Sequence, residues 1–207
     1  MSTTPLRVGV VALCAALLAL VALPAFAQEA PDALVKRVSQ EALDIIKTDA
    51  RVKAGDKAHI RELIKAKIAP HFDMQRMTAL AVGRAWRQAT PEQKQRLSDE
   101  FESLLIRTYS NALDQYRDQQ LDYKPLRVQP DSNEVTVRTE VVRPGQQPVS
   151  IDYSMEKTPA GWKAYDVIVG GVSLVTNYRD EFAQQVSQGG IDSLIKALAA
   201  KNAAPTQ

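Results

Sequence analysis

The sequence predicts an α+β protein in which helices pack on one face of a curved antiparallel β-sheet. Two observations carry this prediction. Apolar residues recur at steps of three and four over residues 32–116 and again after residue 174, as amphipathic helices require. Between these regions, residues 134–169 alternate apolar and polar side chains in runs joined by short turns, which is typical of an antiparallel meander with one solvated face.

The first 27 residues have the pattern of a secretory signal peptide. Arg7 precedes an apolar run, Pro24 ends it, and small residues at Ala25 and Ala27 occupy the cleavage positions. The run is about 16 residues long, which is short for a membrane span. We therefore expect cleavage after Ala27 and a mature chain, residues 28–207, that forms a single domain.

The single cysteine of the chain, Cys14, lies inside this leader. Leu13 precedes it and the apolar run continues past it, so the context is not that of a lipid-modified cysteine. The mature chain is then expected to reach an oxidising compartment without a disulfide, and its core must hold it together. A net charge of +2 gives no basic footprint for nucleic acid.

Several helices are expected before the sheet. The first carries Leu34, Val38, Ala42, Ile45 and Ile46 on one face. A second amphipathic segment, marked by Ile60, Leu63, Ile64 and Ile68, is stopped by Pro70.

Two further helices have clear start signals. Asp73 can cap a short helix that Gly83 ends. Thr90 and Gln93 then form a capping box around Pro91, and the helix that follows should run to about Tyr116.

The strands follow from the alternation of side chains. Residues 134–141 and 149–157 each place apolar residues on one side, and a further strand is expected from Trp162 to Val169. Gly170 and Gly171 then turn the chain into a C-terminal helix, which the double glycine at 189–190 interrupts. Asp166 breaks the apolar pattern of the last strand, and we expect it to face solvent or to accept a hydrogen bond from a neighbouring loop.

A strand, a glycine turn, a serine and a helix in this order also present the nucleophile of a hydrolase, which makes Ser173 a candidate for this role. The closing glycine of the nucleophile elbow is missing, and both histidines, His59 and His71, precede the serine. The favoured interpretation is that Ser173 caps the helix that begins at Leu174. No spacing indicates a metal site or a nucleotide loop, so no catalytic residue, metal or cofactor is expected.

Two stretches of the mature chain carry a resemblance to a known family. They are FDMQRMTALAVGRAWRQATPEQKQRLSDEFESLLIRTY (72–109) and YDVIVGGVSLVTNYRDEF (165–182). Their signature elements are Phe72-Asp73, Gly83-Arg84-x-Trp86, Thr90-Pro91, Arg107-Thr108-Tyr109, Asp166-Val167 and Asn177-Tyr178-Arg179-x-x-Phe182. In this order they resemble the MlaC-like family of periplasmic phospholipid carriers, whose members are also described as toluene-tolerance auxiliary components of an ABC transporter. One departure is the second glycine of the pair Gly170-Gly171.

The resemblance implies a soluble periplasmic shuttle of a Gram-negative bacterium and not an enzyme. It would pass glycerophospholipid between an outer-membrane lipoprotein–porin complex and an inner-membrane ABC transporter with an MCE-domain subunit, and so maintain outer-membrane lipid asymmetry. The implied fold has helices around a curved antiparallel sheet that enclose a hydrophobic pocket for acyl chains.

With this resemblance, the apolar residues of sheet and helices become candidates for the pocket wall. They are Met74, Met77, Leu104, Leu105, Val137, Val149, Ile151, Tyr153, Met155, Val167, Val169, Val175, Tyr178 and Phe182. By periodicity alone, an ordinary filled core is the favoured interpretation, and the resemblance is what favours a pocket. We place Arg84 or Arg179 near the lipid phosphate at the pocket mouth, with pairing to a carboxylate as the alternative role. Lysines and arginines along residues 84–107 are candidates for partner docking.

Two other classes of function remain as alternatives. One is an exported lipid or ester hydrolase that uses Ser173 as its nucleophile. The other is a periplasmic binding protein for another small hydrophobic solute, although the usual two-lobed architecture of such proteins needs alternating β and α units that this chain does not show.

Overall fold

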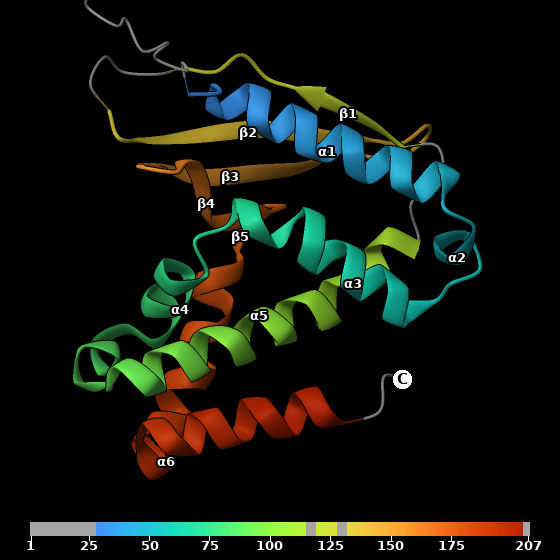
Figure 1. The fold of residues 1–207 in the computed structure, drawn as a ribbon. Coiled ribbons are helices and arrows are strands. Elements are labelled where there is room, and N and C mark those ends of the chain that lie inside the picture. Colours follow the sequence, from blue (N-terminus) through green and yellow to red (C-terminus); the bar gives the residue numbers. More distant parts are fainter. Residues whose placement is uncertain (1–27, 115–118, 128–131, 205–207) are drawn as a thin grey trace, which may run out of the picture.

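A computed structural model describes residues 28–114, 119–127 and 132–204. The described residues form one antiparallel sheet in the order β1-β2-β3-β4-β5 (Figure 1). Its strands are β1 (Gln120–Tyr123), β2 (Glu134–Val142), β3 (Val149–Thr158), β4 (Gly161–Val169) and β5 (Val172–Ser173). The leader and Cys14 lie outside the described residues, so the cleavage site stays a prediction.

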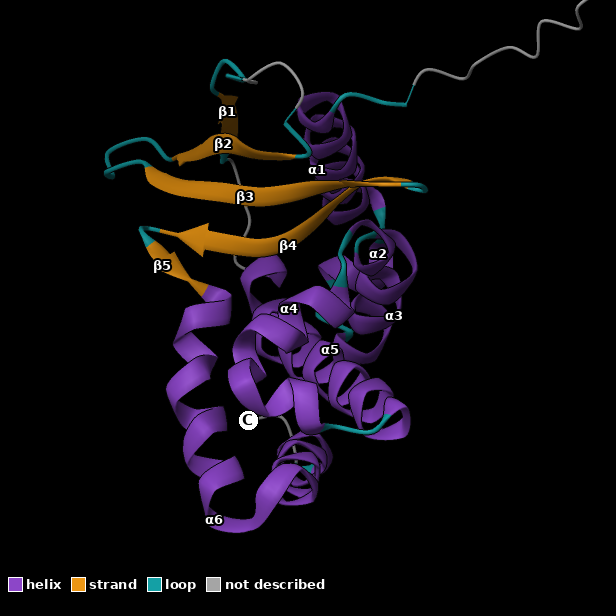
Figure 2. Ribbon diagram, turned by 90° about the vertical axis from the view of Figure 1, so that its left-hand side faces the viewer, coloured by secondary structure: helices purple, strands orange, loops and turns teal. Residues whose placement is uncertain are grey.

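The helices of the described part of the chain confirm the α+β class. They are α1 (Pro31–Thr48), α2 (Ala50–Lys53), α3 (Lys57–Lys67), η1 (Ala69–His71), α4 (Met74–Val82), η2 (Gly83–Gln88), α5 (Pro91–Asp114) and α6 (Leu174–Ala203). Helix α1 lies across the β1–β2 end of the sheet, while α3 to α6 gather below β4 and β5 (Figures 1 and 2). None of these helices has the length and hydropathy of a membrane-spanning segment.

The predicted helix starts are confirmed at atomic level. The Asp73 carboxylate accepts a hydrogen bond from the Arg76 N–H at 2.8 Å. In the capping box, the Thr90 hydroxyl accepts from the Gln93 N–H, and the Gln93 side chain accepts from the Thr90 N–H. The expected end of α5 near Tyr116 falls on residues 115–118, which are outside the described residues.

The strand register explains which side chains share a face. Val137 lies opposite Tyr153, which lies opposite Val167, so these three side chains form one row across the sheet. The register of β3 against β4 then shifts, because Ser154 pairs with Asp166 but Met155 pairs with Ala164. The extra residue is a β-bulge, which increases the local twist of the sheet. The bulge and the short strands β1 and β5 were not predicted from the sequence.

Two packed cores hold the described fold together. The helical core joins α4, α5 and α6 around the three aromatic rings of Phe101, Tyr178 and Phe182. The sheet core packs Leu34 and Val35 of α1 against Val137 and Met155 of the sheet. Phe72, just before α4, packs against both cores, so it marks the place where they meet.

The double glycine in α6 breaks the helix as the sequence predicted. Gly189 and Gly190 have non-helical dihedral angles, and Gly190 has a φ of 73°, which a side chain would strain. A Cβ atom at Gly189 would also lie 2.8 Å from the Cβ of Ser193. The break lets the last part of α6 turn back, so that Leu194 and Leu198 enter the helical core (Figure 2).

Candidate functional site

A large apolar cavity lies between the sheet and the helices. Its volume is about 1480 Å³, including the part that opens to solvent. The wall comes from α3, η1, α4, α5, β3, β4, β5 and the start of α6. The lining residues are Ile64, Ile68, Ala69, Phe72, Met74, Met77, Glu102, Leu105, Ile106, Tyr109, Ile151, Tyr153, Val167, Val169, Val172, Leu174 and Asn177.

Helix α4 is fixed to the sheet at the point where it enters the cavity wall. Phe72 forms a parallel bridge with Ala164 of β4, and the Asp73 N–H donates to the Ala164 carbonyl oxygen at 2.8 Å. Because Asp73 also caps α4, the helix starts at a defined height above the sheet. This attachment directs Met74 and Met77 into the cavity, and their flexible thioether side chains suit an apolar space that can change shape.

A second attachment lies beside the first. The Arg76 guanidinium pairs with Glu134 at 2.6 Å and with Glu156, and it stacks on the Tyr165 ring at 3.7 Å from the ring centre. These partners belong to β2, β3 and β4, so one side chain of α4 connects three strands. The hydrogen bond from Arg76 holds the pKa of the Glu134 carboxyl below its usual value.

The corner between β4 and α6 shapes the opposite wall. The Asp166 carboxylate accepts from the Val167 and Val175 N–H groups at 2.8 and 3.2 Å, and from the Ser173 hydroxyl at 2.5 Å. The Ser173 oxygen in turn accepts from the Thr176 N–H at 3.0 Å. Serine and aspartate together therefore cap α6, and the predicted role of Ser173 as a cap is confirmed.

The same hydrogen bonds decide between the two expectations for Asp166, and they bear on the hydrolase alternative for Ser173. Asp166 serves the start of α6 rather than facing solvent, and Ser173 donates its proton to a carboxylate that already holds two N–H groups. His59 is engaged elsewhere, with its Nε2 2.9 Å from the Asp49 carboxylate. Within the described residues, no group of three or more His, Cys, Asp or Glu side chains is arranged to hold a metal ion.

The mouth of the cavity is marked by lining residues that remain open to solvent. Tyr109, Val169 and Val172 are 38%, 37% and 57% exposed. Glu102 is the one charged side chain among the described residues that line the cavity. It forms no ion pair with any other described residue. The polar groups of the wall are thus few, as expected for a site that binds an apolar ligand.

The structure places half of the predicted pocket residues on this wall. Met74, Met77, Leu105, Ile151, Tyr153, Val167 and Val169 line the cavity. The other predicted residues lie elsewhere. Leu104, Val175, Tyr178 and Phe182 belong to the helical core, Val137 and Met155 belong to the sheet core, and Val149 is 41% exposed.

Neither predicted head-group arginine is part of the cavity wall. Arg84 is exposed on η2, and Arg179 is exposed on α6, where its Nε donates to the Leu80 carbonyl oxygen at 3.2 Å. Arg179 therefore connects α6 to α4.

Ten residues of the cavity wall were not predicted as pocket residues from the sequence. Ile64 and Ile68 were recognised as one face of a helix, and Leu174 as the start of another, but not as pocket residues. Ala69, Phe72, Glu102, Ile106, Tyr109, Val172 and Asn177 were not singled out for the pocket at all. Phe72, Tyr109 and Asn177 lie in the family signature, which was the signal available for them.

The fold and the cavity together define an α+β protein with room for an apolar ligand between sheet and helices. A family model described as MlaC protein matches residues 36–200. The chain therefore belongs to the MlaC protein family, and the resemblance seen in the sequence is confirmed.

Individual relatives agree with this assignment. The toluene tolerance protein ttg2D of Pseudomonas putida is 32% identical over 106 residues, which are 51% of this chain and 49% of that protein. The alignment thus spans about half of that relative. The intermembrane phospholipid transport system binding protein MlaC of Haemophilus influenzae is 21% identical over 179 residues, 85% of this chain and 84% of that protein.

A solved structure is also similar. The phospholipid-binding protein from Ralstonia solanacearum, determined in complex with a phospholipid, is 42% identical to this chain and superposes with a TM-score of 0.78. The comparison covers 86% of this chain and 98% of that protein.

Proposed function

We propose that this protein is a phospholipid-binding transport protein that encloses acyl chains in the cavity between β3, β4 and the helices. The observation that carries the proposal is this apolar cavity of about 1480 Å³, in a chain 42% identical to a protein solved with a phospholipid.

The physical reason for such a carrier is the cost of exposing acyl chains to water. Each methylene group left in water costs about 0.8 kcal/mol, so two chains of about 16 carbons cost on the order of 20 kcal/mol or more. A protein that moves a phospholipid through an aqueous compartment must therefore cover its tails. The head group needs no such cover and would remain at the mouth, beside Glu102, Tyr109 and Asn177.

The place of action that we propose is the periplasm of a Gram-negative bacterium. The leader pattern of residues 1–27 and the membership of the MlaC family support it. There the protein would exchange glycerophospholipid with an outer-membrane lipoprotein–porin complex and with an inner-membrane MCE-domain ABC transporter. This exchange would maintain the lipid asymmetry of the outer membrane.

The test is lipid extraction followed by mass spectrometry of the protein exported with its own leader. We expect co-purifying glycerophospholipid, and we expect the delipidated protein to take up phospholipid from vesicles. Protein that carries no phospholipid and takes up none from vesicles would contradict the proposal. Edman sequencing of the same material should begin at Gln28, in line with the predicted cleavage after Ala27.

Ser173→Ala separates this proposal from an exported hydrolase. The substitution removes the cap of α6 and is expected to lower the unfolding free energy by about 1 kcal/mol, while lipid uptake by the folded protein persists. A hydrolase that uses Ser173 would instead show ester hydrolysis in the wild-type protein and none in the variant.

A further inference from the structure

A polar groove lies between α3 and α5, beside the end of α6. Figure 1 shows α5 between α3 and the last part of α6. The groove holds a space of about 460 Å³. One bound water molecule needs roughly 10–15 Å³ of such space, so the groove has room for a short stretch of polypeptide rather than for one small ion. Its lining is Ala58, Arg61, Glu62, Lys65, Ser103, Ile106, Arg107 and Asn202, and we call it the α3–α5 groove.

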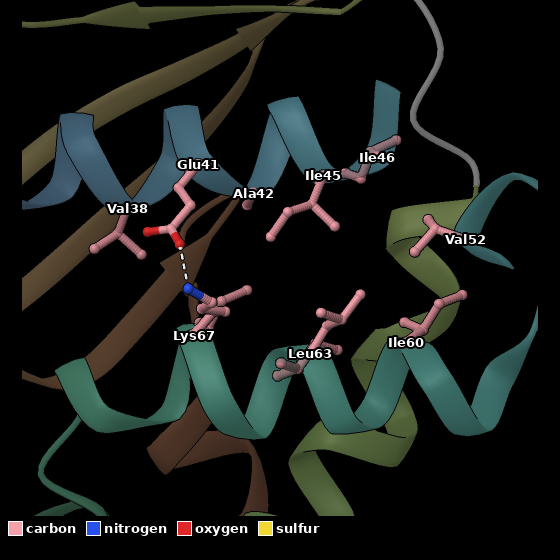
Figure 3. A pocket seen from close by; sticks show the side chains of 11 residues that line it. Val38, Glu41, Ala42, Ile45, Ile46, Val52, Ile60, Leu63 and Lys67 are labelled. Atoms are coloured by element: carbon pink, nitrogen blue, oxygen red, sulfur yellow. Dashed lines mark ion pairs between the residues drawn. The ribbon is translucent and has the colours of Figure 1, made fainter. Parts of the chain in front are cut away.

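The side of α3 that faces α1 is closed. Figure 3 shows Leu63 of α3 and Ile45 of α1 directed toward each other. The space left between the two helices is about 20 Å³, which is enough for about one water molecule. Lys67, on the same side of α3, pairs with Glu41 of α1 at 3.0 Å (Figure 3). A binding partner therefore has access to α3 from the groove and not from the α1 side.

The positive side chains of the groove lack acidic partners. Arg61 and Lys65 lie one turn apart on α3, and Arg107 lines the groove from α5. None of the three forms an ion pair with another described residue. Glu62 is the one carboxylate among the described residues that line the groove, and it lies 3.9 Å from His59 Nδ1. The groove thus concentrates positive charge in a chain whose net charge is only +2.

The Arg107 guanidinium is held in place without being neutralised. Its Nη1 donates to the Asn202 carbonyl oxygen at 2.9 Å. The Asn202 side chain in turn donates to the carbonyl oxygen and to the carboxylate of Glu100, at 2.9 and 2.7 Å. These bonds join the end of α6 to α5. Because the acceptor of Arg107 is a neutral carbonyl oxygen and a guanidinium has five N–H donors, the side chain can still bind a carboxylate.

The groove and the lipid cavity share their helices. Ile106 lines both spaces. Helix α3 contributes Ile64 to the cavity and Arg61 to the groove, and α5 contributes Leu105 to the cavity and Arg107 to the groove. A partner bound in the groove would therefore contact two helices that form the wall of the lipid site. This position favours a partner that delivers or receives the lipid.

We propose that the α3–α5 groove docks an acidic segment of a protein with which this carrier exchanges its lipid. The inference rests on the proposed function and adds to it a surface of this chain. The excess of positive charge selects an occupant rich in Asp and Glu, because complementary charges steer association and fix the orientation of the partners. The hollow shape of the groove favours a protruding polypeptide segment over the flat head-group surface of a membrane.

The test is photo-crosslinking in living cells of the native host, with the full chain exported by its own leader. Ala58→p-benzoylphenylalanine and Ser103→p-benzoylphenylalanine place the probe at exposed positions of the groove. The matched control is Ala183→p-benzoylphenylalanine, because Ala183 is exposed on α6 and lines neither the groove nor the cavity. Mass spectrometry identifies the crosslinked peptide.

Two double variants then test the role of charge. Arg61→Gln with Lys65→Gln removes two positive charges from the groove, and Lys47→Gln with Lys196→Gln removes two exposed positive charges elsewhere. None of these four residues lines the lipid cavity, so both variants should co-purify with as much phospholipid as the wild-type protein.

We expect both groove probes to crosslink to a protein segment in which Asp and Glu outnumber Lys and Arg. The groove variant should lower the yield of this adduct by about tenfold, whereas the control variant should keep it. The docking site would be overturned by the absence of a protein adduct, by an adduct without acidic excess, by an equal yield of the same adduct from Ala183, or by a yield that survives the loss of the groove charges.

Flotation with phosphatidylglycerol vesicles distinguishes a protein from a membrane as the occupant. We expect the groove variant and the control variant to bind these vesicles equally. A loss of vesicle binding in the groove variant alone would assign the surface to an anionic membrane and contradict the proposal. Wild-type protein that carries no phospholipid would instead refute the proposed function.

Discussion

The helical core and the main cavity use the same helices in opposite ways. In the core, the Phe101 ring meets Tyr178 and Phe182 edge-to-face, with ring centres 5.2 and 5.1 Å apart, and Phe101 and Phe182 are almost completely buried. In the cavity, the neighbouring positions Leu105 and Met77 border open space. Leu105 and Met77 belong to both regions, since they pack into the core while facing the cavity.

The difference shows how one chain can be both stable and hollow. Large aromatic side chains interdigitate where α5 and α6 meet, so that region fixes the arrangement of the helices. Toward the sheet, the apolar side chains of the cavity wall leave an open space between them. Stability and ligand binding are therefore expected to respond to different substitutions.

The largest effect on stability is expected for Phe101→Ala. Removing this ring leaves a cavity among Tyr178, Phe182 and Leu97, so the free energy of unfolding should fall by about 3–5 kcal/mol. Urea unfolding monitored by circular dichroism measures the change. Protein that remains folded at low temperature should still take up phospholipid. A stability loss no larger than that of an exposed-site substitution would contradict the view that this region is the filled core.

Val169→Glu should have the opposite effect, a loss of lipid uptake with little loss of stability. Val169 lines the cavity near its mouth and is partly exposed, so a carboxylate there is tolerated by the fold but places a charge against the acyl chains. We expect lipid uptake from vesicles to be abolished. Leu105→Glu should also abolish uptake, with a larger loss of stability because Leu105 is buried.

The matched control is Val149→Glu, because Val149 is similarly exposed on the neighbouring strand but does not line the cavity. This variant should take up lipid like the wild-type protein. If the substitutions at 149 and 169 had equal effects, the boundary of the cavity would have to be redrawn.

Local patterns in the sequence predicted most of the elements, because caps and alternation act over a few residues. The structure confirms the helix starts that were predicted at Asp73, at Thr90 with Gln93, and at Ser173. The inward face of the sheet was also predictable. The sequence did not predict whether an inward residue contacts a packed neighbour or borders open space, because that depends on how distant helices cross the sheet.

Val137 and Tyr153 illustrate this limit. They lie opposite each other on β2 and β3 and share a face, so alternation treats them alike. In the structure both contact the sheet core, but Tyr153 also borders the cavity and Val137 does not. The β-bulge at Tyr165 of β4 could not be predicted from the sequence pattern either, because it depends on how β4 pairs with β3.

Arg76→Met should have a smaller effect that depends on pH. Arg76 lowers the pKa of Glu134 from its usual value of 4.5, so the stabilisation is present above about pH 4.5 and is lost as pH falls through the lower pKa of the folded state. The variant should be less stable than wild type near neutral pH, and the difference should shrink in acid. Urea unfolding across this pH range measures it.

Arg138→Met provides the control for this prediction. The Arg138 guanidinium lies 3.9 Å from Asp152 on the exposed sheet surface and contacts no helix residue among the described ion pairs. Its stability difference from wild type should be small at every pH. A difference for Arg76→Met that stays constant down to acidic pH would rule out the ion pairs as its cause.

The smallest expected effects concern the head group. Glu102 lies on the cavity wall and forms no ion pair with another described residue, so Glu102→Gln should raise the uptake of anionic phosphatidylglycerol by a few-fold relative to zwitterionic phosphatidylethanolamine. Neutralising Arg84 and Arg179 together should leave this ratio unchanged, because neither lines the cavity. Native mass spectrometry with mixed vesicles measures both. If the arginine substitutions changed this lipid ratio and Glu102→Gln did not, the head group would lie near the arginines rather than near Glu102.

The most direct test of the central claim is contact between bound lipid and individual methionines. Met74 and Met77 line the cavity, whereas Met155 is buried in the sheet core without lining it. In protein with isotope-labelled methionine methyl groups and bound phospholipid, isotope-filtered NOE spectra should connect acyl-chain protons to Met74 and Met77 and not to Met155. Acyl contacts to Met155 alone, or to none of the three in lipid-loaded protein, would contradict the location of the lipid site.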